Sequence, residues 1–364
     1  QAMAKFIELS VNSRIYNFSC KLYRRLTVIT GDSAGGKTTL VEVLTGTIPG
    51  VTVKCSLNVK PVNEVSWESM LMKEKDTILF FDDLTCVETK HFADMCKKFL
   101  VKNNLYLVII DRAISQFDFE AESKNLDRLS ISVNEIYEMK NDGNNYWLEA
   151  VEIPVTNDFS NFDCILSEDS GNGFLFFNTF IRNVVAATNG KDSIIQDVKE
   201  LIRVHSKILV MIDLATFGCH WNEFRQRFRY TDAVYVLPDR ECFEQMLLES
   251  NFLNRIPEMQ TELRNPIEYA NRFISWETYY EDLIYRITVK RFYCCTHKRH
   301  SRLSDCYLSS CAGCNPSKKS KCDFIDKDKH CTDRFTQMFE NTKFEKILEL
   351  PRKDEENTES MHLF

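Results

Sequence analysis

The pattern of apolar and polar positions predicts an α/β domain in the first 153 residues. Residues 5–11 and 14–21 alternate like the two arms of a hairpin that turns at Asn12 and Ser13. Buried strands separated by helical patterns follow, which is typical of a parallel sheet covered on both faces. The strands are predicted at 26–30, 51–59, 77–81, 105–110, 132–138 and 146–152. The helices between them are predicted at 37–44, 63–75 and 87–101.

A second α/β pattern starts after residue 160, beyond a stretch at 154–160 that predicts a linker. Its strands are predicted at 162–167, 208–212 and 233–237. Its helices are predicted at 174–188, 193–205, 221–229 and 240–249, and an aromatic-rich helical stretch covers 267–290. We therefore predict a first domain at 1–153, a second, smaller α/β domain with trailing helices at 161–290, a Cys-rich segment at 291–335 and a tail at 336–364.

Composition agrees with a folded chain and adds one local contrast. Of the 364 residues, 44% are hydrophobic and 27% charged, and 26 are Phe, which argues against disorder over most of the length. No apolar stretch approaches the roughly 20 residues that cross a bilayer, so we expect a cytoplasmic protein without membrane contact. The net charge of -7 gives no overall attraction to nucleic acid, but residues 286–334 carry an excess of Lys and Arg.

A phosphate-binding motif follows the apolar strand at 26–30. The run from Gly31 to Thr38 matches G-x-x-x-x-G-K-[ST], in which glycines let backbone N–H groups face phosphate oxygens at the start of a helix. Lys37 is expected to reach the β and γ phosphates and Thr38 to ligate Mg²⁺. The motif predicts ATP or GTP as ligand. The predicted binding residues are Gly31, Asp32, Ser33, Ala34, Gly35, Gly36, Lys37, Thr38 and Thr39.

Acidic residues at the end of the strand at 77–81 supply the expected partner of this motif. Asp82 is predicted to hold Mg²⁺ through water, and with Lys37 and Asp83 it forms the predicted catalytic set. Asp83 is either the base that orients the attacking water or a cap of the following helix beside Thr85. Asp111 and the residue after it are either a γ-phosphate sensor or a solvated turn.

The opening of the chain resembles ABC-type and related P-loop ATPases. In these families an antiparallel hairpin leads into the P-loop strand, as the stretches 5–11 and 26–40 do here. The resemblance implies ATP binding and hydrolysis. The chain departs from the ABC pattern because no L-S-G-G-Q signature lies between the motif and Asp82, and only about 40 residues separate them. ATP-sandwich dimerisation of the ABC kind is therefore not expected.

A second set of acidic residues follows the strands of the second domain. Glu168 follows the strand at 162–167, Asp213 follows the strand at 208–212, and Glu244 lies on the helix after the third strand. The ends of parallel strands lie along one edge of a sheet, so Glu168 and Asp213 are candidate ligands of a second Mg²⁺, with Glu244 as a third candidate. The alternative is that these acids simply end strands.

The order of these strands and acids resembles the Toprim domain over residues 161–250. Toprim domains occur in topoisomerases, primases and the overcoming-lysogenization-defect nucleases, which pair them with an ATPase of this kind, several of them in phage defence. Glu168 fits the Toprim Glu, but Ala215 stands where the second Asp of Asp-x-Asp is expected, so the domain is a degenerate match.

Two hypotheses follow from the resemblance. ATP hydrolysis controls a metal-dependent nuclease of phage defence or of a mobile element, or nucleotide occupancy switches how the chain holds a protein partner or a second copy of itself without cleavage. A small-molecule kinase ranks last, because no arginine-rich lid follows the motif.

The Cys-rich segment carries 7 of the chain's 14 cysteines between Cys294 and Cys331. A Cys-x-x-Cys pair can grip a metal ion from a tight turn, so one hypothesis is a structural Zn²⁺ site, and the other is a loop with buried thiols. The lysines of this segment either contact phosphates of nucleic acid or are simply solvated. The candidate zinc ligands are Cys306, Cys311, Cys314 and Cys322.

Overall fold

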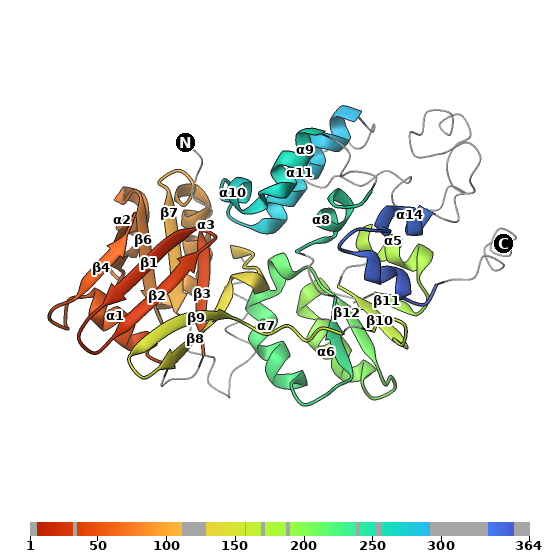
Figure 1. Ribbon diagram of the computed structural model, residues 1–364, viewed down its shortest axis with the longest axis horizontal. Helices are drawn as coiled ribbons and strands as arrows, with labels where there is room; N and C mark the ends of the chain where they lie inside the picture. Colours follow the sequence, from red (N-terminus) through yellow and green to blue (C-terminus); the bar gives the residue numbers. More distant parts are fainter. Residues whose placement is uncertain are drawn as a thin grey trace, which may run out of the picture. The chain divides into compact units, whose positions relative to one another are not determined.

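The chain forms two compact units, each with its own sheet (Figure 1). Unit 1 comprises Gln1–Glu152, Leu214–Gln226 and Arg264–Tyr279, and unit 2 comprises Ile153–Asp213, Arg227–Leu263 and Tyr280–Phe364. The predicted α/β class is confirmed, with one large, mostly parallel sheet and a second parallel sheet. The computed structural model describes residues 6–31, 35–110, 129–156, 158–168, 172–186, 190–237, 241–251, 257–291 and 334–352.

The sheet of unit 1 has nine strands in the order β4-β1-β2-β9-β8-β3-β7-β6-β5. Five consecutive strands from β8 to β5 are parallel. The predicted hairpin of β1 and β2 is antiparallel and joins the rest of the sheet through a parallel pairing of β2 with β9. Parallel strands need apolar side chains on both faces, which the fully buried β3 and β7 supply. The strands are β1 Ile7–Asn12, β2 Asn17–Leu22, β3 Leu26–Thr30, β4 Thr52–Cys55, β5 Asn58–Pro61, β6 Thr77–Asp82, β7 Leu105–Ile110, β8 Ile136–Asp142 and β9 Asn145–Ala150.

Helices cover both faces of this sheet, as the alternation along β6 requires. Phe80 joins the core cluster that includes Leu40 of α1 (Lys37–Leu44). Phe81 points to the opposite face, where its ring meets Phe92 of α3 (Lys90–Phe99) edge-on, with centroids 5.2 Å apart. Helix α2 (Trp67–Lys73) lies beside α3, and its Trp67 ring is 5.6 Å from that of Phe92.

The stretch predicted as one strand at 51–59 is two strands on opposite edges of the sheet. Thr52–Cys55 pairs with β1, whereas Asn58–Pro61 pairs with β6. Because two residues separate these edge strands, the two edges lie close together, and α1 contacts β1 as well as β5 and β6. The single-strand prediction was wrong because the alternation of apolar and polar residues continues across the connection.

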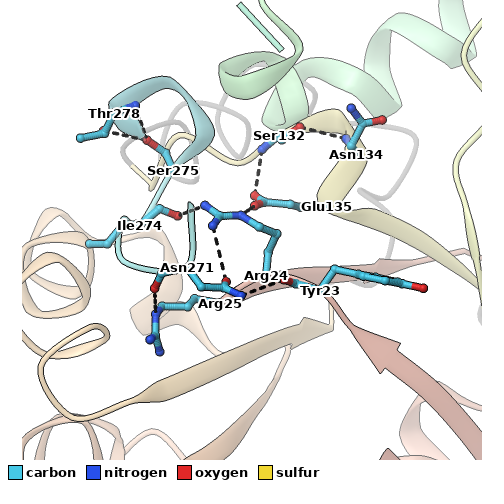
Figure 2. A network of polar contacts seen from close by, with 10 residues as sticks. All are labelled: Tyr23, Arg24, Arg25, Ser132, Asn134, Glu135, Asn271, Ile274, Ser275 and Thr278. Carbon is cyan, nitrogen blue, oxygen red and sulfur yellow. Dashed lines mark hydrogen bonds and ion pairs between the residues drawn. The ribbon is translucent and has the colours of Figure 1, made fainter. Parts of the chain in front are cut away.

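Two consecutive buried arginines fix the beginning of β3 (Figure 2). Arg24 Nε donates to Glu135 Oε1 at 3.1 Å, with side chains 4% and 2% exposed, and its guanidinium lies 4.6 Å from the Trp276 ring. Arg25 Nε donates to the Asn271 carbonyl at 2.6 Å, and Asn271 Nδ2 donates to the Tyr23 carbonyl at 3.2 Å. Residues 264–279 are thus an integral part of unit 1.

Helix α7 (Leu214–Phe228) begins directly after Asp213, seven residues before its predicted start. Residues 214–226 belong to unit 1, where the Gly218 N–H donates to the Ile131 carbonyl at 2.9 Å. Only glycine permits this approach, because a Cβ at position 218 would lie 2.5 Å from that oxygen. The remaining helices of this region are α9 Pro257–Arg264, α10 Pro266–Ala270 and α11 Trp276–Arg291.

Unit 2 has a four-stranded parallel sheet in the order β11-β10-β12-β13. The predicted helix at 174–188 was wrong in its second half, where Val184–Ala186 forms the edge strand β11. Two β-branched residues in succession favour extended structure at that position. The elements are β10 Cys164–Ser167, α5 Asn172–Phe180, α6 Ile194–Leu201, β12 Ile208–Met211, β13 Val234–Val236 and α8 Phe243–Leu248.

Part of the predicted tail belongs to the core of unit 2. Helix α14 (Arg334–Phe339) and the short 3-10 helix Glu345–Glu349 lie inside the range predicted as Cys-rich segment and tail, 291–364. Phe335 stacks on Phe180 of α5 with ring centroids 5.0 Å apart, and Phe339 is fully buried. Among the described residues no helix is long and apolar enough to cross a membrane.

Candidate functional site

The predicted phosphate-binding motif lies between β3 and α1 in unit 1. Gly31 follows β3 with φ of 118°, and Gly36, with φ of 83°, is the residue before the first turn of α1. The first N–H groups of a helix have no intrahelical acceptor and form an anion site. Three predicted binding residues, Asp32, Ser33 and Ala34, lie outside the described residues.

The lysine of the motif folds back toward the end of β3. Lys37 is 3% exposed, and its Nζ donates to the carbonyl oxygen of Gly31. Its ammonium group is therefore held at the junction between strand and helix. Thr38 is exposed and Thr39 half-buried in the same turn of α1, beside Gly35 and Gly36.

A pair of stacked tyrosines supports the motif from the antiparallel strands. The rings of Tyr16 and Tyr146 stack with centroids 4.2 Å apart, and the Tyr16 hydroxyl donates to the Gly36 carbonyl at 3.3 Å. A Cβ at Gly36 would lie 2.4 Å from the Tyr146 ring, so this contact requires glycine. Burial raises the pKa of Tyr16 well above its usual range, so the hydroxyl stays protonated. Sequence reasoning missed both tyrosines, because nothing distinguishes them from ordinary apolar positions of strands.

Asp82 ends β6 at the same edge of the sheet as the motif. Asp82 and Ile29 both pair in register with Ile110 of β7, the strand between them. Two strand spacings of about 4.8 Å put Asp82 about 10 Å from Ile29, level with the end of β3. The structure thus brings this predicted magnesium residue to the edge where Gly31 begins the motif.

Asp83 is exposed and has a left-handed backbone, with φ of 52°. Such a conformation in a non-glycine residue carries strain and is frequent at functional sites. The N-cap of the following 3-10 helix (Thr85–Glu88) is Leu84, and Thr89 caps α3, so neither helix uses Asp83 as its N-cap. The second strand-end prediction, Asp111 with Arg112, lies outside the described residues.

Glu64 is a further acid at this end of the sheet that sequence reasoning missed. Its Oε1 accepts hydrogen bonds from the backbone N–H and the hydroxyl of Thr85, two residues after Asp83. The hydroxyl bond is the main cause that lowers the pKa of Glu64 below its ordinary value. No motif marks Glu64, since it follows β5 in a polar stretch.

Helix α7 adds polar side chains to the same region of unit 1. Asn222 Nδ2 donates to Thr30 Oγ1 at 3.2 Å, and Arg225 Nη1 donates to Glu138 Oε1 at 2.6 Å. Lys140 Nζ donates to the other Glu138 oxygen, also at 2.6 Å. Burial works against ionisation of Glu138, but the bonds from Lys140 and Arg225 outweigh it and lower its pKa.

In unit 2 the structure brings Glu168 and Asp213 together. They follow the adjacent parallel strands β10 and β12, and the Asp213 N–H donates to Glu168 Oε2 at 2.7 Å. The chain order of the sheet reverses at this pair, with β11 on one side of β10 and β12 on the other. Ligands of open α/β sheets bind at the carboxyl ends of strands at such a switch point.

Glu244 of α8 lies close enough to this pair to interact with it. Burial and then the charge of Asp213 raise the pKa of Glu244 to about 7, with a smaller contribution from Glu281. Within the part of the chain that the structure describes, no three His, Cys, Asp or Glu side chains are arranged to hold a metal ion. A magnesium site at Glu168 and Asp213 therefore stays a prediction.

No protein-family model matches the chain, and no curated protein matches its sequence significantly. The predicted zinc ligands Cys306, Cys311, Cys314 and Cys322 lie outside the described residues. All seven cysteines in the described ranges are free thiols, and those of Cys86, Cys96, Cys164 and Cys242 are buried.

Proposed function

We propose that unit 1 binds ATP or GTP with Mg²⁺ and hydrolyses it, as a P-loop ATPase does. The observation that carries the proposal is the position of the G-x-x-x-x-G-K-T motif between a buried parallel strand and a helix, with Lys37 turned back onto Gly31. Gly31 and Gly36 have φ of 118° and 83°, conformations that glycine adopts readily and that let the backbone between them wrap around a phosphate tail.

The side chains of unit 1 divide the chemistry between them. Lys37 binds the β and γ phosphates, and Thr38 and Asp82 hold the metal ion, Asp82 through water. Asp83 accepts a proton from the water that attacks the γ phosphorus, and the bond from that phosphorus to the bridging oxygen breaks, which releases inorganic phosphate and the diphosphate. The exposure of Asp83 and its position next to Asp82 support the role of base.

Calorimetric titration of the full chain with ATP and GTP in the presence of Mg²⁺ tests the proposal. We expect Lys37→Ala to weaken binding at least about 10-fold, because a charge-assisted bond to phosphate is worth about 1.5–3 kcal/mol. Lys60→Ala is the matched control, since Lys60 is a 43%-exposed strand lysine paired with Glu74. Asp83→Asn should abolish phosphate release but retain binding. Equal affinities of the wild type and Lys37→Ala would contradict the proposal.

For unit 2 we propose a Toprim-like role under the control of the nucleotide. Support comes from the meeting of Glu168 and Asp213 at the switch point of the sheet. In the first form of this proposal the two carboxylates hold Mg²⁺ for cleavage of nucleic acid, and in the second the unit binds a partner without cleavage. Incubation of the full chain with plasmid, Mg²⁺ and ATP separates them.

Loss of plasmid cleavage in Glu168→Gln, with cleavage kept in Glu200→Gln, would support the nuclease form. Glu200 is an exposed acid on α6 of the same unit and so controls for the change of charge. If the wild type hydrolyses ATP but leaves the plasmid intact, the nuclease form is excluded and the partner-binding form remains.

A further inference from the structure

Arg225 of α7 lies beside the strand that leads into the phosphate motif. Its acceptor, Glu138 of β8, is the register partner of Thr30, the last residue of β3. Neighbouring strands lie about 4.8 Å apart, so the ion pair is one strand away from the point where the motif begins. Within the motif, a Cβ on Gly31 would lie 3.8 Å from the backbone nitrogen of Met139, the residue after Glu138.

The direction of α7 points this arginine toward the phosphate edge of the sheet. Gly218 contacts Ile131, which precedes β8, and Arg225, two turns later, contacts Glu138 inside β8. From Gly218 to Arg225 the helix therefore runs toward the carboxyl ends of β8 and β3. A cation is favoured at the C-terminal end of a helix, where Arg225 lies.

The contacts of Arg225 leave it able to exchange partners. The Arg225 side chain is 34% exposed and the Glu138 side chain 22%, so neither is fully buried in the core. Glu138 has a second cation, Lys140, that would keep its charge balanced if Arg225 moved. Asn222, one turn earlier on the same face of α7, holds the helix to Thr30 and would keep it in place during such a movement.

We propose that Arg225 is a phosphate-binding arginine of the nucleotide site, supplied in cis by α7, which passes from Glu138 to the terminal phosphate of a bound nucleoside triphosphate. The inference rests on the nucleotide binding proposed above. A planar guanidinium matches a phosphate in a bidentate geometry, and arginines so placed stabilise the charge of phosphoryl transfer. A diphosphate lacks the group that Arg225 would bind, so the arginine makes the site distinguish ATP from ADP.

The ratio of ATP to ADP affinity, measured by calorimetry on the full chain with Mg²⁺, tests this role. We expect Arg225→Gln to weaken ATP binding about 10- to 100-fold and to change ADP binding less than about 2-fold, because a charged hydrogen bond to the terminal phosphate is lost. The ADP affinity serves as an internal check that the variant is folded. Lys140→Gln, which removes the cation that balances Glu138 once Arg225 has moved, should weaken ATP binding less than Arg225→Gln does and leave ADP binding unchanged.

Glu138→Gln should change ATP affinity in the opposite direction to Arg225→Gln. Its neutral amide competes less well for the guanidinium, so ATP should bind more tightly while ADP binding is unchanged. A purely structural ion pair predicts instead that Arg225→Gln and Glu138→Gln weaken both nucleotides equally or neither. Either result would overturn the inference but leave nucleotide binding standing. Absence of ATP binding by the wild type would remove the proposed function and this inference together.

Discussion

The buried ion pair of Arg24 and Glu135 makes a quantitative prediction about the stability of unit 1. Both side chains are almost fully buried, and their 3.1 Å contact compensates two charges that have lost their hydration. Replacement of Arg24 by Met would leave the carboxylate of Glu135 buried with backbone donors but without the guanidinium. Removal of one partner of a buried pair costs about 3–5 kcal/mol, a large part of the roughly 5–15 kcal/mol that stabilises a typical protein.

The other contacts of Arg24 contribute less than the ion pair. Its bonds to Asn271 Oδ1 and the Ile274 carbonyl, at 3.5 and 3.4 Å, are at the long limit for hydrogen bonds. Stacking on the Trp276 ring at 4.6 Å contributes a further cation–π term of about 1–2 kcal/mol. We therefore expect Arg24→Met to cost about 4–7 kcal/mol.

Urea unfolding followed by circular dichroism and tryptophan fluorescence measures the change. The exposed pair of Lys21 and Glu8, 3.9 Å apart with side chains 50% and 70% exposed, is the control, and Lys21→Met should cost less than about 1 kcal/mol. The double variant with Arg24→Met and Glu135→Met should be much more stable than the sum of the single changes, because it leaves no charge in the core. A cost of Arg24→Met below that of the control, or simple additivity, would refute the reasoning.

Three further substitutions probe other parts of the structure. Gly36→Ala should weaken nucleotide binding more than Gly46→Ala. Both glycines have positive φ, but only at Gly36 would a Cβ meet a neighbour, the Tyr146 ring. Equal effects of the two changes in calorimetry would contradict the packing argument. Gly218→Ala should cost about 1–3 kcal/mol in urea unfolding, because its Cβ would overlap a backbone carbonyl, and an unchanged midpoint would mean that α7 does not pack there. With the pKa of Glu244 raised to about 7 from an ordinary 4.5, the folded state holds a proton that the unfolded chain releases, so stability should fall by about 1–3 kcal/mol as pH rises from 4.5 to above 7. Glu244→Gln should remove this fall. If the melting temperature changes between pH 5 and 8 in the same way for the wild type and the variant, Glu244 does not cause the fall.

Much of the fold could be predicted because its strands are short apolar runs. The predicted strand at 105–110 coincides with β7, and the strands that carry Asp82, Glu168 and Asp213 lie within about two residues of their predicted ranges. Strand ends place acids at a sheet edge, so the meeting of Glu168 and Asp213 followed from the order of the sequence.

The remaining features depend on contacts between distant parts of the chain. Val184 follows an apolar helical stretch without a break in the pattern, and although its β-branched side chain favours extended structure, the strand depends on pairing with Ile165. The partners of Arg24 are separated from it by up to 250 residues, beyond the reach of any local pattern. Ser132 with Glu135 is the exception, since a capping box can be read locally, yet the stretch was predicted as a strand.

Unit 1 cannot finish folding until most of the polypeptide has been synthesised, because it includes residues 264–279. Arg24 leaves the exit tunnel early, yet its partner Asn271 is synthesised 247 residues later. During that interval the two arginines at the start of β3 lack their acceptors at residues 271 and 274, and α7 has not yet been made in full. A gene fragment that stops at residue 153 would therefore encode only part of unit 1, without residues 214–226 and 264–279.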